Sequence, residues 1–267
     1  MTDNDAQNQD RLDLLWTDDD VVPDVVYPDL EFLFQQMLDL TLEEVAPRQG
    51  ELILDIGCGK AVDGAHLSRS GALVVGVEPS QVMLQRARGH LSEHNAHVLL
   101  AQGIGENLPF KSNTFDKAMC KGALDHFLSP SRTMDEIARV LKPGGEMVIS
   151  IANFESLGFR VGKRLYPVTR HLCRLNYTER KPWEPPPDHL YKFDYPFLTA
   201  LAKARFTIRR KKGISLLFGL PMWGSFLNRL PRSLSFAILR LLDKLARPLP
   251  SLADVIVIRC SPLRTVK

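Results

Sequence analysis

The stretch ILDIGCGKA, residues 53–61, decides the fold, because it joins a short apolar run to a turn with two glycines. The run ELILDIG (51–57) predicts a buried strand, since it is apolar, short and followed at once by turn residues. Gly57 and Gly59 let the backbone after this strand approach a ligand closely, and the next helix would point its N-terminus at the same place. The stretch therefore predicts a ligand site at the carboxyl end of a strand.

Apolar runs and helical patterns alternate on both sides of this stretch. Strands are expected at 72–78, 97–102, 115–120 and 146–152, and helices at 29–45 and 60–70. Two more helices are expected, one with Ser80 as its N-cap and one at 131–141 with Ser129-Pro130 as its start. Continuous apolar strands separated by helices predict a mostly parallel sheet with helices on both faces. The expected fold class is therefore α/β, Rossmann-like and doubly wound.

The remaining segments are assigned by composition and pattern. Residues 1–20 are polar and acidic and are expected to be disordered, whereas 21–267 are expected to form a single domain around a core at 50–152. The pattern beyond this core predicts, in order, a proline-rich loop insertion (153–193), a helix (197–204), a strand (206–215), a helical insertion (216–250) and a last strand (253–260).

Composition excludes several classes of protein. The chain is 45% hydrophobic and 24% charged, which is ordinary for a soluble globular protein. Its longest uncharged apolar run, 214–228, has about 15 residues where a membrane span needs roughly 20, and the N-terminus lacks the features of a secretory signal. A cytoplasmic protein without a transmembrane helix is expected. The widely spaced cysteines predict neither a zinc cluster nor a disulfide scaffold; they are Cys58, Cys120, Cys173 and Cys260.

Charge is distributed unevenly along the chain. Residues 156–267 carry 22 Lys and Arg against 6 Asp and Glu, whereas residues 1–50 carry 2 against 13. This asymmetry suggests nucleic acid, an anionic lipid or an acidic substrate as a partner of the C-terminal half. The alternative is that the acidic and basic ends partly neutralise each other in the folded chain.

Two further features narrow the class of ligand. The dinucleotide-binding fingerprint expects a third glycine where this chain has Val62, and Glu78 ends the next strand about 20 residues after the loop, where it could bind ribose hydroxyls. With the segments VVGVEPSQVMLQRAR (74–88), GENLPFKSNTFDKAM (105–119) and DEIARVLKPGGEMVIS (135–150), the chain resembles the class I S-adenosylmethionine-dependent methyltransferases, especially those similar to ubiquinone and menaquinone methyltransferases. The resemblance covers residues 30–152 well and implies a seven-stranded sheet with an antiparallel last strand.

The resemblance also implies which residues bind the cofactor, S-adenosylmethionine. Gly57 and Gly59 would pass under its amino-acid end, Asp55 would order the turn or hold its ammonium group, and Glu78 would bind the ribose hydroxyls. Family members often carry an Asp where this chain has Ile104, so here only backbone groups would read the adenine. The full implied set is Asp55, Gly57, Cys58, Gly59, Glu78, Pro79, Ile104, Gly105 and Lys121.

The acceptor side is expected after the fourth strand, in CKGALDHFLSP (120–130). Methylation of an oxygen needs a base or a metal to remove its proton, and His126 with Asp125 is the best candidate. The pair resembles the acid–His step of the ubiquinone O-methyltransferases. Those enzymes hold a metal with an additional acid where this chain has Gly122, so no metal is expected. A histidine bonded only to backbone is the alternative interpretation of His126.

Two other segments are candidates for acceptor binding. His189 and Tyr191, in DHLYKF (188–193), would border the pocket or merely anchor the proline-rich loop. The segment SLSFAILRLLDKLAR (233–247) predicts an amphipathic helix with a mostly basic polar face, and Trp223 precedes it. The insertion would act as a lid over the pocket, as a contact with an anionic membrane at the inner face, or as both.

The leading functional hypothesis is methylation of a small-molecule or lipid-like acceptor, on oxygen, with S-adenosylmethionine as the donor. RNA methylation is an alternative suggested by the basic C-terminal half, although no RNA-binding module is recognisable and no nucleic-acid partner is expected. A degenerate, non-catalytic adaptor is the third possibility, and Ile104 and Gly122 are its only support. The sequence leaves the acceptor and the oligomeric state open.

Overall fold

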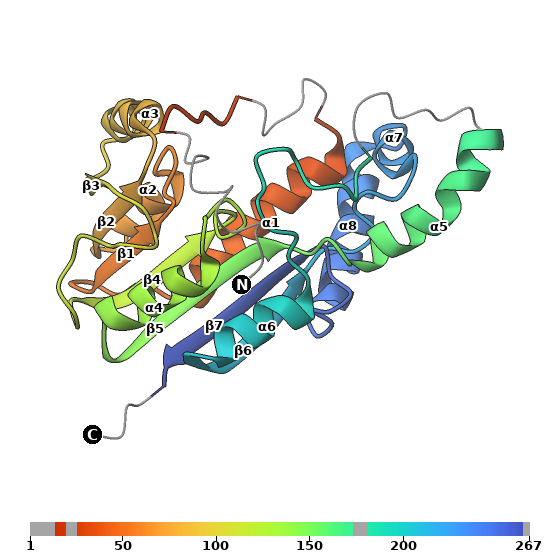
Figure 1. Cartoon of the computed structure of the whole chain (residues 1–267). Helices are drawn as coiled ribbons and strands as arrows, with labels where there is room; N and C mark the ends of the chain where they lie inside the picture. Colours follow the sequence, from red (N-terminus) through yellow and green to blue (C-terminus); the bar gives the residue numbers. More distant parts are fainter. Residues whose placement is uncertain (1–13, 20–25, 173–180, 264–267) are drawn as a thin grey trace.

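The computed structural model describes residues 14–19, 26–172 and 181–263, which form one seven-stranded sheet with helices on both faces (Figure 1). The strand order is β3-β2-β1-β4-β5-β7-β6, and β7 runs antiparallel to the other six strands. The strands are β1 (Leu52–Ile56), β2 (Leu73–Glu78), β3 (Val98–Gln102), β4 (Phe115–Lys121), β5 (Leu141–Ala152), β6 (Phe206–Ile214) and β7 (Val255–Pro262). The predicted doubly wound sheet with an antiparallel last strand is confirmed.

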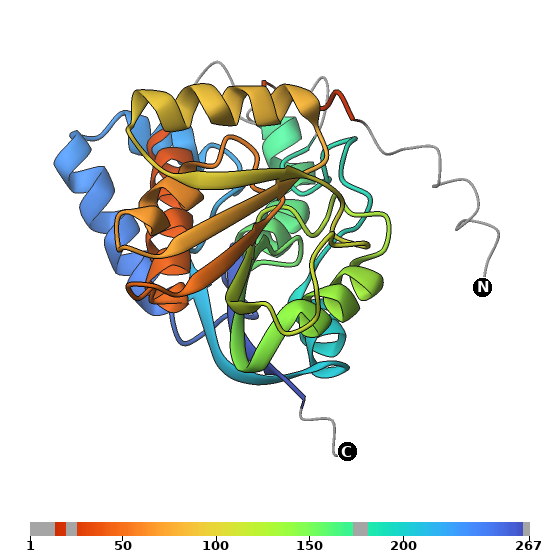
Figure 2. The same cartoon turned by 90° about the vertical axis from the view of Figure 1, so that its left-hand side faces the viewer.

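Helices cover both faces of the sheet because its strands are apolar on both sides (Figure 2). One face packs against α1 (Pro28–Val45), α2 (Val62–Ser68) and α3 (Gln81–Glu93). The other packs against α4 (Pro130–Val140) and α6 (Tyr195–Lys203). The predicted helix starts are confirmed at Ser80 and Ser129, whose hydroxyls accept the N–H groups of Met83 and Arg132.

The chain reverses its winding direction beside β1, and this places the site. From β1 the chain builds β2 and β3 on one side, and it then returns to build β4 and β5 on the other. Ligands in open α/β sheets bind at such a switch point, outside the carboxyl ends of the strands. The turn after β1 and the loop after β4 therefore lie side by side at this edge.

The segment 153–193 differs from the expected loop. It begins with α5 (Leu157–Leu172), a helix that contains two glycines and Pro167. A Cβ added to Gly158 would lie 2.3 Å from the carbonyl oxygen of Phe218, so the helix packs directly on the backbone of residues 217–218. This tertiary contact outweighs the low helix propensity of glycine and proline, which made the segment resemble a loop. Part of the proline-rich stretch lies outside the described residues.

The insertion 216–250 contains α7 (Trp223–Asn228) and α8 (Arg232–Ala246), which pack against α1. Phe32, Leu227 and Leu239 are buried at this contact. The faces of α8 differ from those expected, because Asp243 was assigned to the polar face and is buried instead. Asp243 points inward, accepts the N–H of Ser215 and pairs with Arg247, while Leu234, Leu241 and Leu245 are exposed.

The N-terminal expectation fails for residues 14–19, which make specific contacts with α3 and the site. The cysteines among the described residues, Cys58, Cys120 and Cys260, are free and buried. Cys173 lies outside them. No helix in the described part of the chain is both long and apolar enough to span a membrane.

A buried carboxyl group at the start of the last strand predicts how stability depends on pH. Asp254 is 4% exposed, and burial raises its pKa to about 7 although it accepts the N–H of Phe218. Between pH 4 and pH 7 the folded chain keeps this proton and the unfolded chain releases it. The free energy of unfolding therefore falls by up to about 1.4 kcal/mol per pH unit as the pH rises through this window.

Replacing Asp254 by Asn should remove this contribution. In urea unfolding at several pH values, the variant should gain stability relative to wild type as the pH rises from 4 to 7. Asp39→Asn, on the exposed side of α1, serves as the matched control and should show no such trend. A constant difference between Asp254→Asn and wild type across this range would contradict the assignment.

Candidate active site

The glycine turn after β1 packs tightly against the loop after β4. Gly57 and Gly59 have φ of +71° and +51°, and the N–H groups of Gly57 and Cys58 both donate to the carbonyl of Val77. A Cβ on Gly57 would lie 2.5 Å from the Cβ of Ala123 and 3.6 Å from the ring of Phe127. Only glycine allows both the left-handed backbone and this contact. The turn and the predicted acceptor loop are therefore direct neighbours.

Two buried carboxyl groups border the turn. Glu78 is 5% exposed and accepts the N–H groups of Gly59, at 3.1 Å, and Ser80, at 3.0 Å. Burial raises the pKa of Glu78. Asp55 is 2% exposed, and its pKa is raised well above the usual value, first by burial and then by the charge of Asp63. The Oδ2 atom of Asp55 has no hydrogen-bond partner among the described residues.

These two groups fit the cofactor that the sequence implies. A buried carboxylate oxygen without a partner is costly, and an ammonium group would compensate it. The oxygens of Glu78 are fixed by two backbone N–H groups at the end of β2, where they can still accept hydrogen bonds from a ribose diol. Asp55 and Glu78 would therefore suit the amino-acid end and the ribose of S-adenosylmethionine, and these contacts stay a prediction.

The other residues of the predicted cofactor set line the same sheet edge with different partners. Lys121 pairs with Asp63 at 3.0 Å, and the carbonyl of Pro79 accepts from Gln102. The thiol of Cys58 is buried, which raises its pKa, and it packs against Gly76. Their contacts with the cofactor stay a prediction.

The segment expected to meet the adenine forms a tight turn. The carbonyl of Ile104 accepts the N–H of Asn107 at 3.3 Å, so it already serves its own turn. A Cβ on Gly105 would lie 2.8 Å from Cγ2 of Thr133, so a glycine is needed for close packing on α4. Position 104 is an isoleucine and offers no side-chain carboxylate to the adenine. Contacts of the adenine with the backbone stay a prediction.

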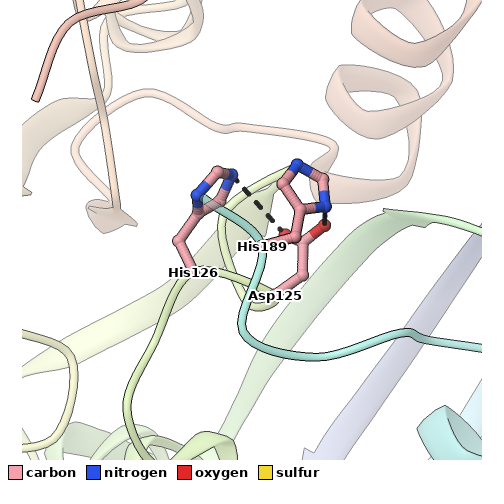
Figure 3. A group of neighbouring side chains, drawn as sticks. All are labelled: Asp125, His126 and His189. Carbon is pink, nitrogen blue, oxygen red and sulfur yellow. Dashed lines mark ion pairs between the residues drawn. The ribbon is translucent and has the colours of Figure 1, made fainter. Parts of the chain in front are cut away.

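On the acceptor side, three predicted residues come together from two distant segments (Figure 3). The carboxylate of Asp125 is buried, with its Oδ2 at 2.8 Å from Nδ1 of His189 and its Oδ1 at 4.0 Å from Nε2 of His126. The carbonyl of Asp125 also accepts the N–H groups of Leu190, at 2.8 Å, and Tyr191, at 3.2 Å. These backbone bonds hold residues 189–191 against the loop after β4.

This geometry gives His189 the better-defined chemistry of the two histidines. Oδ2 of Asp125 lies 2.8 Å from Nδ1 of His189, closer than Oδ1 lies to His126, although Nδ1 makes no hydrogen bond with the described residues. A carboxylate that held a proton at Nδ1 would leave Nε2 to accept one. His126 lies with its ring 4.5 Å from that of His189. The sequence predicted His126 as the base and His189 as a pocket residue, whereas the contact with Asp125 favours His189 as the base.

Sequence reasoning missed two residues at this cluster. Asp188 places its Oδ2 at 3.5 Å from Nδ1 of His126, and Trp16 donates from its indole N–H to the same Oδ2 at 3.0 Å. The ring of Trp16 also meets that of His126 edge-on, with centroids 5.6 Å apart. The pair Asp188-His189 was visible in the sequence, but nothing there linked it to His126, and no signal identified Trp16.

Two further predicted acceptor residues have other contacts. The hydroxyl of Tyr191 donates to the carbonyl of Leu128 at 2.9 Å, so it anchors the loop that carries His189. Trp223 packs beside the cluster of Phe32, Leu227 and Leu239 between α1 and α8. A role for either residue in binding the acceptor stays a prediction.

The cluster also has the composition of a metal site. Asp125, His126 and His189 each offer one ligand atom, and these atoms all lie within 4.8 Å of one another. The expectation of no metal relied on Gly122, the position at which the ubiquinone O-methyltransferases carry an acid. His189 brings a third potential ligand from a segment far away in sequence, so that expectation needs an experimental test.

Part of the chain is similar to known methyltransferases. Residues 54–149 match the family model described as a methyltransferase domain. Over 109 residues the chain is 41% identical to a demethylmenaquinone methyltransferase of Corynebacterium kroppenstedtii. This aligned segment covers 41% of this chain and 45% of that relative. Over 117 residues it is 33% identical to a ubiquinone biosynthesis O-methyltransferase of Alkalilimnicola ehrlichii, and this segment covers 43% of this chain and 47% of that relative. The chain therefore matches less than half the length of these relatives.

Solved structures show the same fold over most of the chain. One is an S-adenosylmethionine-dependent methyltransferase of Thermotoga maritima, described as a possible histamine N-methyltransferase. It superposes with a TM-score of 0.56 and 21% identity over 86% of this chain and 89% of that one. A protein from Pyrococcus horikoshii gives a TM-score of 0.56 and 18% identity over the same shares. Residues 54–149 thus match a methyltransferase-domain family, and the described part of the chain has the fold of these solved structures.

Proposed function

We propose that this chain is an S-adenosylmethionine-dependent methyltransferase that methylates an oxygen of a small-molecule or lipid-like acceptor. The observation that carries the proposal is the 2.8 Å contact between Oδ2 of Asp125 and Nδ1 of His189, beside the loop that packs against the glycine turn. It provides a base beside the site where Asp55 and Glu78 fit the methyl donor. The name of one relative, a ubiquinone biosynthesis O-methyltransferase, supports oxygen as the acceptor atom.

The proposed chemistry divides between the donor and the chain. When bound, S-adenosylmethionine would supply a methyl group from its positively charged sulfur, which would keep the electron pair of the broken C–S bond while the acceptor oxygen gained the methyl group. Nε2 of His189 accepts the proton of the acceptor hydroxyl, and Asp125 holds the ring and stabilises the resulting positive charge. Asp55 and Glu78 fix the donor, so that much of the rate comes from alignment.

The surface of α8 supports a lipid-like acceptor. Leu234, Leu241 and Leu245 are exposed on this helix, and Arg240 and Lys244 are exposed beside them. Exposed leucines with basic neighbours are typical of helices that lie at an anionic membrane surface. Because Asp243 faces inward, the outer surface of α8 is more apolar and more basic than its sequence suggested. We infer that α8 brings the chain to the membrane that holds its acceptor.

The cofactor assignment predicts the effect of changing Glu78. Hydrogen bonds to a charged group contribute about 1.5–3 kcal/mol, so Glu78→Gln and Glu78→Ala should weaken binding of S-adenosylhomocysteine by about 10- to 100-fold in calorimetric titration. The control is Glu146→Gln in β5, which removes the carboxylate that pairs with Arg259 and should leave the affinity unchanged. Unchanged affinity in both Glu78 variants would refute the ribose assignment, and no binding by wild type would favour the adaptor hypothesis.

The base assignment predicts which variants lose methyl transfer. With labelled S-adenosylmethionine and a lipid or quinone extract, His189→Gln and Asp125→Asn should each lower the rate by about 10²–10⁴-fold, because proton removal by a positioned base is lost. Their affinity for S-adenosylhomocysteine should stay within about twofold of wild type. His126→Gln should cost less than His189→Gln. The reverse order would return the role of base to His126.

Removal of divalent cations separates a base from a metal at the same cluster. If His189 acts as a base without a metal, the protein should keep full activity after dialysis against EDTA. If EDTA removes the activity, Zn²⁺ or Mn²⁺ restores it, and neither ion restores it in His189→Gln, then Asp125, His126 and His189 bind a cation instead.

The membrane contact predicts a loss of vesicle binding when the leucines of α8 become polar. Leu241→Ser with Leu245→Ser should weaken binding to anionic phospholipid vesicles by at least about tenfold in a sedimentation assay. Leu99→Ser, which changes a leucine 72% exposed on β3, is the matched control and should bind as wild type does. If the double variant of α8 binds the vesicles as well as wild type does, α8 does not make the membrane contact.

A further inference from the structure

Residues 14–19 cross the edge of the sheet where the cofactor is expected. The N–H of Gln81 donates to the carbonyl of Leu14, and the hydroxyl of Ser80 donates to the carbonyl of Trp16 at 2.7 Å. Ser80 is also the residue whose N–H donates to Glu78. One end of this segment, which we call the strap, is therefore fixed beside the proposed ribose site.

Charged groups hold the strap to the elements on either side of the turn. Asp18 pairs with Lys60, which follows Gly59, at 2.8 Å and with Arg86 of α3 at 2.6 Å. Asp19 pairs with Arg86 at 2.7 Å, and this guanidinium lowers the pKa of Asp19 to about 2. The carboxylate of Asp19 therefore stays ionised across the physiological range of pH. The strap is thus tied to both the glycine turn and α3.

Trp16 joins the cofactor side of the site to the acceptor side. Its carbonyl accepts from Ser80, next to the proposed ribose site, while its indole N–H donates to Asp188. Asp188 in turn faces Nδ1 of His126, whose ring meets that of Trp16. A single residue of the strap therefore contacts a neighbour of Glu78 and the group that orients an acceptor-side histidine.

We propose that the strap closes over the bound cofactor, and that Trp16 is a positioning residue that sets His126 through Asp188. The inference rests on the proposed function, since it assumes the cofactor between Glu78 and Asp125. The strap spans the ends of the three loops that border this position, after β1, β2 and β4. The cofactor can leave only when the strap opens, and closure completes the acceptor side.

The release rate of the cofactor tests the closure. Full-length protein loaded with tritiated S-adenosylmethionine is diluted into unlabelled S-adenosylmethionine, and the remaining label is followed. Asp18→Asn with Asp19→Asn should release label about five- to tenfold faster than wild type, because the network of exposed ion pairs is lost. Lys60→Ala should release it faster as well. Salt should speed release from wild type and have less effect on the double variant.

The control is Glu43→Gln, which breaks an exposed ion pair with Lys212 on the opposite part of the fold and should release label at the wild-type rate. Equal release rates in wild type, the double variant and Lys60→Ala would overturn the strap and leave the proposed function intact. If wild type binds no S-adenosylmethionine, the proposed function itself fails, so the two failures are distinguishable.

The positioning role of Trp16 has its own spectroscopic test. Trp16→Phe keeps an aromatic ring beside His126 but loses the N–H that donates to Asp188. In long-range ¹H–¹⁵N spectra of the histidine rings, the Nδ1 resonance of His126 should shift in this variant and that of His66 should not. Trp183→Phe serves as the matched control. An unchanged His126 resonance in Trp16→Phe would overturn the positioning role.

Discussion

The close packing of the glycine turn on the loop after β4 is the contact on which the rest of the site depends. A side chain at Gly57 would collide with Ala123, and the acceptor cluster begins two residues further on, at Asp125. Because β1 and β4 are neighbours at the switch point of the sheet, no long segment is needed to bring donor and acceptor loops together. A larger residue at Gly57 would separate the two halves of the proposed reaction.

The same edge of the sheet concentrates buried acids. Asp55 and Glu78 both have raised pKa values because they are held away from water, and Asp55 keeps an oxygen without a partner in the described chain. Groups of this kind weaken the fold without a ligand, and a ligand that supplies their partners stabilises the folded state by mass action. In this account, cofactor binding and stability are coupled through the two carboxyl groups, with the strap as a third contribution from outside the sheet.

The sequence predicted the elements whose signals are local. The turn at 57–59, the N-caps at Ser80 and Ser129 and the alternation of strands and helices follow from residue type and spacing, and all of these elements are present. The helix α5 escaped prediction because Gly158 is placed by its contact with Phe218, which no local pattern encodes. The inward side of α8 was also misjudged, since the partner of Asp243 is the backbone of Ser215.

The site shows the same division. The carboxyl ends of β1, β2 and β4 could be located from the sequence, and so could Asp125 and His126. The pairing of Asp125 with His189 bridges 64 positions of the chain, and that of Trp16 with Asp188 bridges 172, so spacing alone carried no signal for them. Such contacts depend on the whole sheet being assembled first.

A crystal structure of the chain with S-adenosylhomocysteine would show whether the donor lies between the glycine turn and the acceptor cluster. We expect the ribose hydroxyls on the carboxylate of Glu78, the ammonium at Oδ2 of Asp55, and the sulfur facing Asp125 and His189 beneath the strap. A ligand bound elsewhere, or with its sulfur turned away from His189, would contradict this expectation.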